Sequence, residues 1–344
     1  MKGVIVRLMT SRPASALFRM ILGSRVAIFM LHRFREPGTA GSGCDPEHVR
    51  ALLSEVRSRG VQILSVWEVM DGLAHGRPVR GLCFTVDDGY QDFIRFGAPV
   101  FREFDCPVAL FLATGFIDGD YWYWWDKIKY AFWNTPLKVL DLPFMDRRLE
   151  LDGGNHRREL ARLVSARIKD LPQAQRSEGL KQVLASLEVQ IPSKPTAGYE
   201  PLRWEQIRSL HDSGFDFGPH GVKHLSFNTA DPTDVQEEVR GSFARLQEML
   251  PNPLPVFCYP YGTRDDVSNR VAAIVEKEGM AGALTAIPGY TQTGGGHPTR
   301  RFLIPRFVLP EDPLAFGQIA YGLERGKEIY RHVMGKDTPS LSSR

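Results

Sequence analysis

Short apolar runs alternate with helical patterns along most of the chain, and this alternation constrains the fold more than any other feature. The clearest runs are VAIFML (26–31), GLCFTV (81–86) and PVALFLAT (107–114), each long enough for a buried strand. A helix with an Asp-Pro start and a terminal glycine is expected over 45–60. Strands separated by helices predict βαβ units and a mainly parallel sheet.

The same alternation resumes after residue 200. A helix at 204–214 precedes the strand FDFG (215–218), VFCYPYG (256–262) follows, and a helix at about 267–279 precedes GALTAI (282–287). VQILSV (61–66) is expected to be another short strand. The number of these units favours an α/β fold, a distorted, TIM-like (β/α) barrel that is closed or nearly closed.

The alternation of strands and helices is interrupted between about 121 and 193. This segment begins YWYWWDKIKYAFW, has an expected short hairpin around LELDGG (149–154), and continues with two amphipathic helices. We interpret it as a mostly helical insertion. The expected organisation is a basic amphipathic segment (1–24), a barrel with this insertion (25–325), and a C-terminal helix end with a disordered tail (326–344).

Charge and cysteine content narrow the function classes. A net charge of +3 over 344 residues gives no electrostatic reason to expect nucleic acid as a partner. The four cysteines form no CxxC pair, so no zinc-finger or thioredoxin motif is present. Cys83 and Cys258 lie in apolar runs and are expected to be buried free thiols, which is typical of a reducing compartment. We expect a cytoplasmic protein.

The N-terminus is apolar but interrupted by arginines, so neither a secretory signal nor a membrane span is expected. Seven Lys or Arg residues precede the first acid, Glu36. A short helix over 13–22 has two interpretations. It either makes a peripheral contact with the inner face of a membrane or closes one end of the barrel.

FTVDDGYQD (84–92) places Asp87 and Asp88 at the carboxyl end of an apolar strand, where parallel α/β folds bind ligands. Asp-Gly is also a common turn pair. Two adjacent carboxylates at such an edge are costly unless a cation or a proton separates their roles. The pair therefore predicts a cation site.

His220 and His224, in GPHGVKHLSF, follow the apolar strand FDFG (215–218), so they also lie at a strand's carboxyl end. Their spacing on a helix or helical turn places both imidazoles on one face, although such pairs are often only polar surface residues. With one aspartate they form a two-histidine, one-carboxylate metal site with open positions. The other aspartate then remains available as a base.

FCYPYG (257–262) is a third motif. It is either a strand that ends in a proline turn or a groove wall with a backbone N–H that binds an oxyanion.

These three elements, in this order, resemble the polysaccharide deacetylases of carbohydrate esterase family four, the NodB-homology domain. The resemblance implies a metal-dependent hydrolase that removes N-acetyl groups from sugars, with Zn²⁺ expected first and Co²⁺ or Ni²⁺ as alternatives. By this match Asp87 is the base, and Tyr261 supplies an N–H for the oxyanion. Asp88, His220 and His224 hold the metal.

The chain departs from the family motifs at several positions. Val86 replaces Phe, Gly221 replaces Ser or Thr, and Cys258 replaces an arginine that orients the base. We expect Arg306, in LIPRFVL at the end of the last strand, to replace that arginine, unless it only caps a strand.

The family's late Leu-x-His motif is missing after the third motif. His32, which ends the first strand, resembles the early acid of a permuted subgroup and is our first expectation for the general acid. The alternative is His297 in GGGHP. Pro260, Tyr259 and Trp125 are expected to contact substrate, although YWYWW can equally be a packing seam.

The expected partner is a glycan or glycolipid, such as a lipid-linked glycan, a nucleotide-linked sugar or a formamido-sugar lipid. Two other functions stay open. One is a deformylase or amidase that acts on a non-polymeric amide with the same site. The other is a non-catalytic glycan-binding pseudoenzyme, which the missing motif arginine alone favours.

Overall fold

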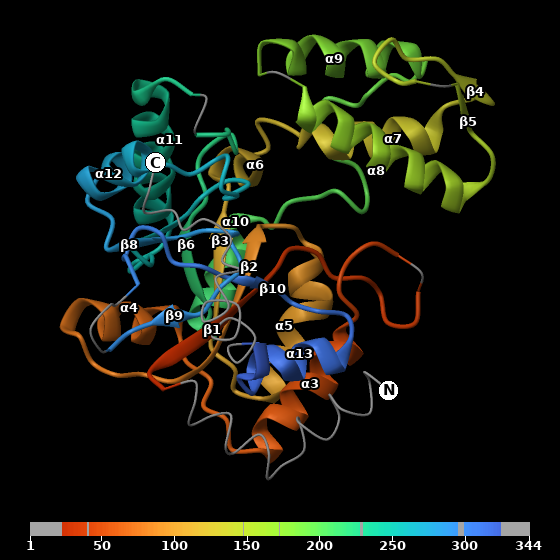
Figure 1. The fold of residues 1–344 in the computed structure, drawn as a ribbon. Helices are drawn as coiled ribbons and strands as arrows, with labels where there is room; N and C mark the ends of the chain where they lie inside the picture. The colour runs from red at the N-terminus through yellow and green to blue at the C-terminus, as the bar shows by residue number, and fades with distance from the viewer. Residues whose placement is uncertain are drawn as a thin grey trace, which may run out of the picture. The chain divides into compact units, whose positions relative to one another are not determined.

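The computed structural model of the chain describes residues 23–39, 41–146, 148–171, 173–227, 230–294 and 299–324 (Figure 1). The chain divides into two compact units. The first comprises Met1–Thr114 with Leu202–Arg344, and the second comprises Gly115–Pro201. The helix expected over 13–22 and the tail expected over 326–344 lie outside the described residues.

A six-stranded sheet forms the centre of the first unit, in the order β10-β1-β2-β3-β6, with β9 paired to β1. All pairs are parallel except β1 with β9. The strands are β1 (Arg25–Leu31), β2 (Gly81–Asp88), β3 (Val108–Leu112), β6 (Asp216–Pro219), β9 (Thr291–Gln292) and β10 (Phe307–Val308).

A separate parallel pair, β7 (Val256–Cys258) and β8 (Gly282–Leu284), continues the curl of the sheet. A few backbone hydrogen bonds join this pair to the neighbouring segments. Leu254 donates to Phe217 at 2.7 Å, and Thr285 donates to Ile304 at 2.8 Å. The fold is thus the expected distorted (β/α) barrel, but its ladder is interrupted and the sheet forms a curled half-barrel.

Continuous burial explains the uninterrupted apolar strand sequences. Every residue of β2 and β3 is buried. Side chains from several strands, among them Ile28, Cys83, Phe111, Val256 and Leu284, form one core cluster. Cys83 and Cys258 are buried free thiols, as predicted.

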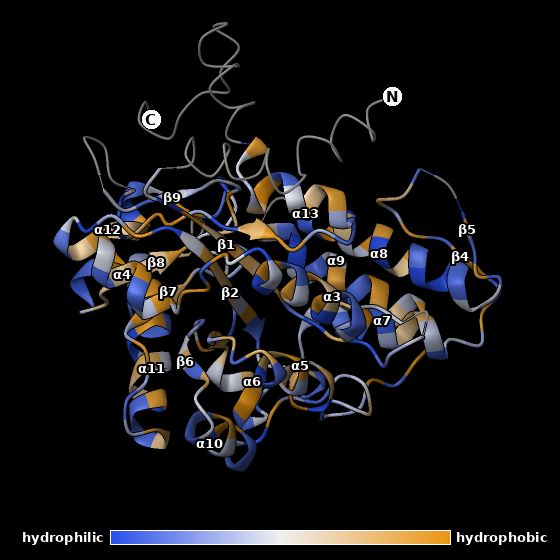
Figure 2. Ribbon diagram, turned by 90° about the horizontal axis from the view of Figure 1, so that it is seen from below, coloured by the Kyte–Doolittle hydropathy of each residue, from blue (hydrophilic) through white to orange (hydrophobic). Residues whose placement is uncertain are grey.

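Helices surround this sheet and show both hydrophilic and hydrophobic residues (Figure 2). They are α3 (Pro46–Ser58), α4 (Val66–His75), α5 (Ala98–Glu103), α10 (Trp204–Asp212), α11 (Pro232–Met249), α12 (Asn269–Lys277) and α13 (Pro313–Ala320). The prediction of a strand at 61–66 is wrong. Only Ile63 forms an isolated bridge, because Ser65 caps α4 and starts that helix at Val66. The long helix α11 was not anticipated.

The second unit has its own core. It contains α7 (Trp124–Asn134), the antiparallel hairpin β4 (Val139–Leu140) with β5 (Leu149–Glu150), α8 (Gly154–Asp170) and α9 (Gln173–Ser186). This arrangement includes the predicted hairpin and both predicted amphipathic helices. Across the parts of the chain that the structure describes, none of the helices combines the length and apolar character required to traverse a bilayer.

Candidate active site

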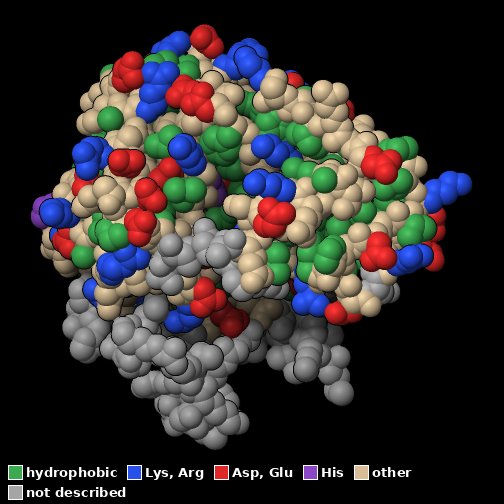
Figure 3. All heavy atoms as spheres, turned by 90° about the horizontal axis from the view of Figure 1, so that it is seen from above, with side chains coloured by type: hydrophobic (Ala, Val, Ile, Leu, Met, Phe, Trp, Pro, Cys, Tyr) green, Lys and Arg blue, Asp and Glu red, His purple; other side chains and the backbone are tan. Residues whose placement is uncertain are grey.

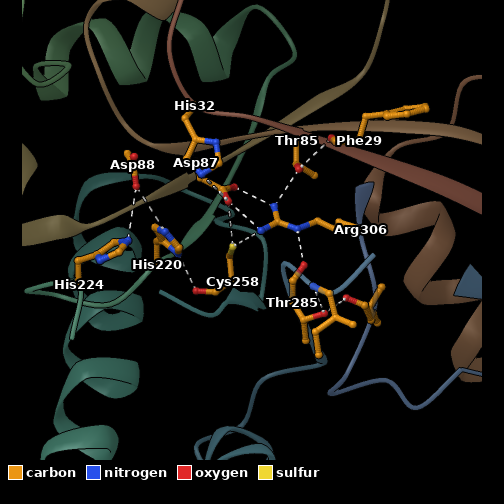
Figure 4. Close-up of polar contacts among 12 residues, drawn as sticks. Phe29, His32, Thr85, Asp87, Asp88, His220, His224, Cys258, Thr285 and Arg306 are labelled. Atoms are coloured by element: carbon orange, nitrogen blue, oxygen red, sulfur yellow. Dashed lines mark hydrogen bonds and ion pairs between the residues drawn. The ribbon is translucent and has the colours of Figure 1, made fainter. Parts of the chain in front are cut away.

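The predicted site residues of the first unit gather at the carboxyl end of the curled sheet (Figure 4). Asp87 and Asp88 are the last residues of β2, and both are buried. His32 follows β1 directly, and His220 follows β6. Arg306 directly precedes β10, so the prediction that it lies at the end of the last strand is wrong, although its guanidinium still reaches Asp87. The parallel register of neighbouring strands brings these ends together.

Asp88 lies between two imidazoles. Its Oδ1 atom is 3.6 Å from Nε2 of His220 and 3.6 Å from Nε2 of His224. These separations are too long for good hydrogen bonds. Two ligand atoms each about 2.1 Å from a tetrahedral zinc ion would lie about 3.4 Å apart. The spacing of the three donor atoms therefore fits a metal ion.

The orientation of one histidine and the protonation state of the other also fit this role. Nδ1 of His220 is 2.7 Å from the carbonyl oxygen of Cys258, which can only accept, so Nδ1–H donates and Nε2 is the atom that faces Asp88. Burial opposes the charged ring, but Cys258 and Asp88 outweigh it and raise the pKa of His220, so a metal would bind by displacing the proton on Nε2. Burial, together with the neighbouring His220, lowers the pKa of His224 to about 3, so its ring is neutral. Neutral imidazoles and a carboxylate are suitable zinc ligands.

The two histidines do not share a helix face, contrary to the interpretation of their spacing. They lie in a loop in which Gly221 has φ +81° and His224 has φ +55°. This turn, rather than a helical repeat, brings the ring centroids to 4.8 Å.

Backbone strain concentrates at the site. Among the described residues, five non-glycine residues have positive φ, and three of them are Asp88 (+75°), His224 (+55°) and Tyr261 (+58°). Such conformations cost about 1–3 kcal/mol each and persist where the surrounding structure determines them. The strain thus marks the same loops that the motifs identified.

Arg306 makes a two-pronged contact with Asp87. Nη1 donates to Oδ1 at 2.9 Å and Nη2 donates to Oδ2 at 2.8 Å. The remaining guanidinium contacts are with the carbonyl oxygen of Thr285, the hydroxyl of Thr85 and the sulfur of Cys258. Burial alone would raise the pKa of Asp87, but Arg306 outweighs it and holds that pKa well below its usual range. Asp87 is therefore an ionised, buried carboxylate.

A second donor set, Asp87, His220 and Cys258, also has ligand atoms within 4.8 Å of one another. Here a metal does not fit. The Arg306 guanidinium already contacts both Asp87 and Cys258, and it would repel a cation. Burial also raises the pKa of the Cys258 thiol, which disfavours the thiolate that a metal needs.

His32 stands at the open side of the site. Its Nε2 atom is 3.9 Å from Oδ2 of Asp87, and its side chain is 46% exposed. The residues that follow it are held by Asp92, which pairs with Arg33 and accepts the Phe34 N–H at 3.0 Å. Sequence reasoning missed this anchor. His297 lies outside the described residues.

The predicted substrate-contacting residues have different surroundings. Tyr261 contacts the His224 ring at a centroid distance of 4.7 Å, and Pro260 is buried. Tyr259 is 1% exposed and its hydroxyl donates to the carbonyl oxygen of Phe302, so the structure does not support its stacking on a sugar. Trp125 lies in α7 of the second unit, stacked on Tyr123 at 4.5 Å, which fits a packing seam.

Surface charge agrees with the small net charge. On the face drawn in Figure 3, basic and acidic side chains are interspersed.

The fold and the site together define a class of protein: curled (β/α) barrels with aspartate and histidine residues at the carboxyl ends of their strands. Residues 154–282 match the model of the family described as polysaccharide deacetylase. The matched region contains His220, His224 and Tyr261, whereas the aspartate pair precedes it. The resemblance to the polysaccharide deacetylases that the motifs predicted is thus confirmed over these residues.

Solved structures show the same fold. The deacetylase PplD of Streptococcus pyogenes, in complex with acetate, has 15% identity and a TM-score of 0.55, covering 86% of this chain and 98% of that one. IcaB from Ammonifex degensii has 15% identity and a TM-score of 0.54, covering 87% and 97%. A polysaccharide deacetylase from Bacillus cereus has 13% identity and a TM-score of 0.53, covering 87% and 69%. A sequence comparison with curated proteins finds no match.

Proposed function

We propose that this protein is a metal-dependent hydrolase that removes N-acetyl groups from an amino sugar in a polysaccharide or a lipid-linked glycan. One observation carries the proposal. An ionised, arginine-held carboxylate, Asp87, directly precedes Asp88, whose oxygen faces two histidine nitrogens at metal-ligand spacing. A base beside a cation site is the arrangement that amide hydrolysis by water requires.

Asp88, His220 and His224 would hold the metal, with Zn²⁺ the best match to these ligands and Co²⁺ or Ni²⁺ as alternatives. A divalent ion supplies polarisation of the amide carbonyl and acidification of water.

The chain's own groups do the rest. Asp87 accepts a proton from the attacking water, and Arg306 keeps Asp87 oriented. The backbone N–H of Tyr261 stabilises the oxyanion, and His32 gives a proton to the departing amine as the C–N bond breaks. Acetate and a free amino sugar leave.

We further propose a cytoplasmic protein that meets its substrate at the inner face of the membrane. Four free cysteines support a reducing compartment. The seven Lys and Arg residues that precede Glu36 support attraction to anionic lipid. The solved relatives named as deacetylases support acetyl as the group removed, rather than formyl.

Metal content and acetate release test this proposal together. We expect about one divalent ion per wild-type chain by elemental mass spectrometry, with acetate released from N-acetylglucosamine oligomers. His220→Ala loses both, whereas Asp87→Asn keeps the metal and loses activity. His75→Ala, on an exposed position of α4, is the control and keeps both. Wild-type protein that binds no zinc when it is supplied would overturn the proposal.

A further inference from the structure

A carboxylate from α11 holds the loop between the two candidate metal-binding histidines. The Glu238 side chain is buried, and its Oε2 atom accepts the backbone N–H of Val222 at 2.8 Å and of Lys223 at 2.9 Å. Oε1 accepts the Lys223 N–H at 3.1 Å. Three N–H···O contacts to one buried carboxyl group make a firm anchor for the loop, because leaving these amides without a partner would be costly.

The rest of the loop is anchored unevenly. The N–H of His220 donates to Leu112 of β3 at 2.9 Å, which fixes the first histidine to the sheet. His224 follows four residues later, after a glycine and two residues whose amides both point at Glu238. The carbonyl oxygen of Gly221 accepts the Thr114 N–H at 3.0 Å, and Glu238 holds the next two residues, so the position of His224 relative to His220 depends in part on Glu238.

The absence of a side chain at Gly221 leaves room for the Glu238 carboxylate. A Cβ atom at position 221 would lie 2.7 Å from Oε2 of Glu238 and 3.5 Å from Cγ of Pro260. The left-handed φ of +81° disfavours any other residue as well. The glycine that departs from the family motif is thus the residue that lets Glu238 reach the loop.

We propose that Glu238 is a positioning residue for the metal site and takes over the support that a hydroxyl at position 221 would give. The proposal rests on the proposed function, because it assumes that the two histidines bind a metal. The support comes from α11 and acts through the backbone amides of Val222 and Lys223.

Zinc affinity provides the first test, measured by competition with a chromophoric chelator. We expect Glu238→Gln and Glu238→Ala to weaken zinc binding about 10–100-fold, the usual effect of removing an outer partner of a ligand. The control is Glu237→Gln, an equal charge change at an exposed neighbouring position on α11, which should leave affinity unchanged. Equal zinc affinities in Glu238→Gln and Glu237→Gln would overturn the proposal.

Hydrogen exchange of metal-free protein separates this idea from the proposed function. We expect faster exchange of the Val222 and Lys223 amides in Glu238→Gln than in Glu237→Gln, whether or not zinc binds. Unchanged exchange would refute the anchor even if the enzyme is a deacetylase.

Gly221→Ala completes the test. It should weaken zinc binding by a smaller factor in the Glu238→Ala background than in wild type, and equal factors would contradict the proposed pairing.

Discussion

The guanidinium of Arg306 pairs with both carboxylate oxygens of Asp87, at 2.9 and 2.8 Å, inside the buried end of the sheet. The two residues are 219 positions apart in the chain. Removing either partner leaves the other as an uncompensated buried charge, and the cost of that charge leads to the first prediction.

Arg306→Met should destabilise the metal-free protein by about 3–5 kcal/mol at pH 7.5, because Asp87 loses its partner. In wild type the depressed pKa of Asp87 contributes stability above the unfolded value of about 3.9, and this is lost only as pH falls through the folded value. In the variant the buried carboxylate has a raised pKa, so it is destabilised as pH rises. The deficit relative to wild type should therefore shrink from pH 7.5 to pH 5.

Urea denaturation with a chelator present, at both pH values, measures this deficit. Arg300→Met, which removes an exposed arginine bonded to Asn269, is the matched control. A deficit of the same size at both pH values would show that the ion pair is not its source.

His32→Ala should separate substrates by their leaving groups. A general acid contributes about 10²–10⁴-fold to a reaction whose leaving amine must be protonated. Acetate release from an N-acetyl sugar should fall by this factor, whereas hydrolysis of an aryl acetate, whose phenolate leaves without a proton, should fall far less. Steady-state rates with both substrates give the ratio, with His75→Ala as reference. Equal losses on both substrates would exclude His32 as the acid.

Tyr261→Ala should retain most of the catalytic rate. The proposed oxyanion donor is the backbone N–H, which the substitution keeps. Losing a donor of this kind costs about 10²–10³-fold in kcat. A loss of that size in Tyr261→Ala, with metal content unchanged, would assign the role to the side chain instead.

Cys258→Arg should destabilise the protein, because it places a second guanidinium beside Arg306, whose Nη2 atom is already 3.1 Å from the sulfur. The double variant Cys258→Arg with Arg306→Met restores one guanidinium for one carboxylate and should have a higher Tm than Cys258→Arg alone. Thermal unfolding of the single and double variants checks this. Additive losses would mean that position 258 cannot substitute for position 306.

The sequence was most informative where chemistry coincides with a strand end. Asp88 and His220 each follow an apolar run, so the parallel topology alone predicts that they meet. Arg306 was predicted to reach Asp87 from the end of the last strand, whereas it reaches Asp87 from the position just before β10. The apolar runs themselves predicted β1, β2 and β3 because burial on both faces leaves no other pattern.

The parts that escaped prediction depend on distant contacts. Glu238 looks like any acidic residue of an amphipathic helix, and only the folded structure shows its carboxylate turned toward the loop at 222–223. Asp92 is equally inconspicuous in sequence, although it holds the residues after His32. The histidine spacing suggested a helix because four residues also span one helical turn, whereas Gly221 permits a tighter loop.

The late position of Arg306 has a consequence for biosynthesis. β10 pairs with β1, with Phe29 opposite Phe307 and Met30 opposite Val308. β1 can therefore complete this pairing only after β10 has been synthesised. A nascent chain that ends before residue 306 contains Asp87 but not its countercharge. The central strand of the sheet therefore cannot pair its ionised carboxylate until Arg306 has been synthesised. Chains truncated before β10 should be substrates for proteolysis rather than partly active enzymes.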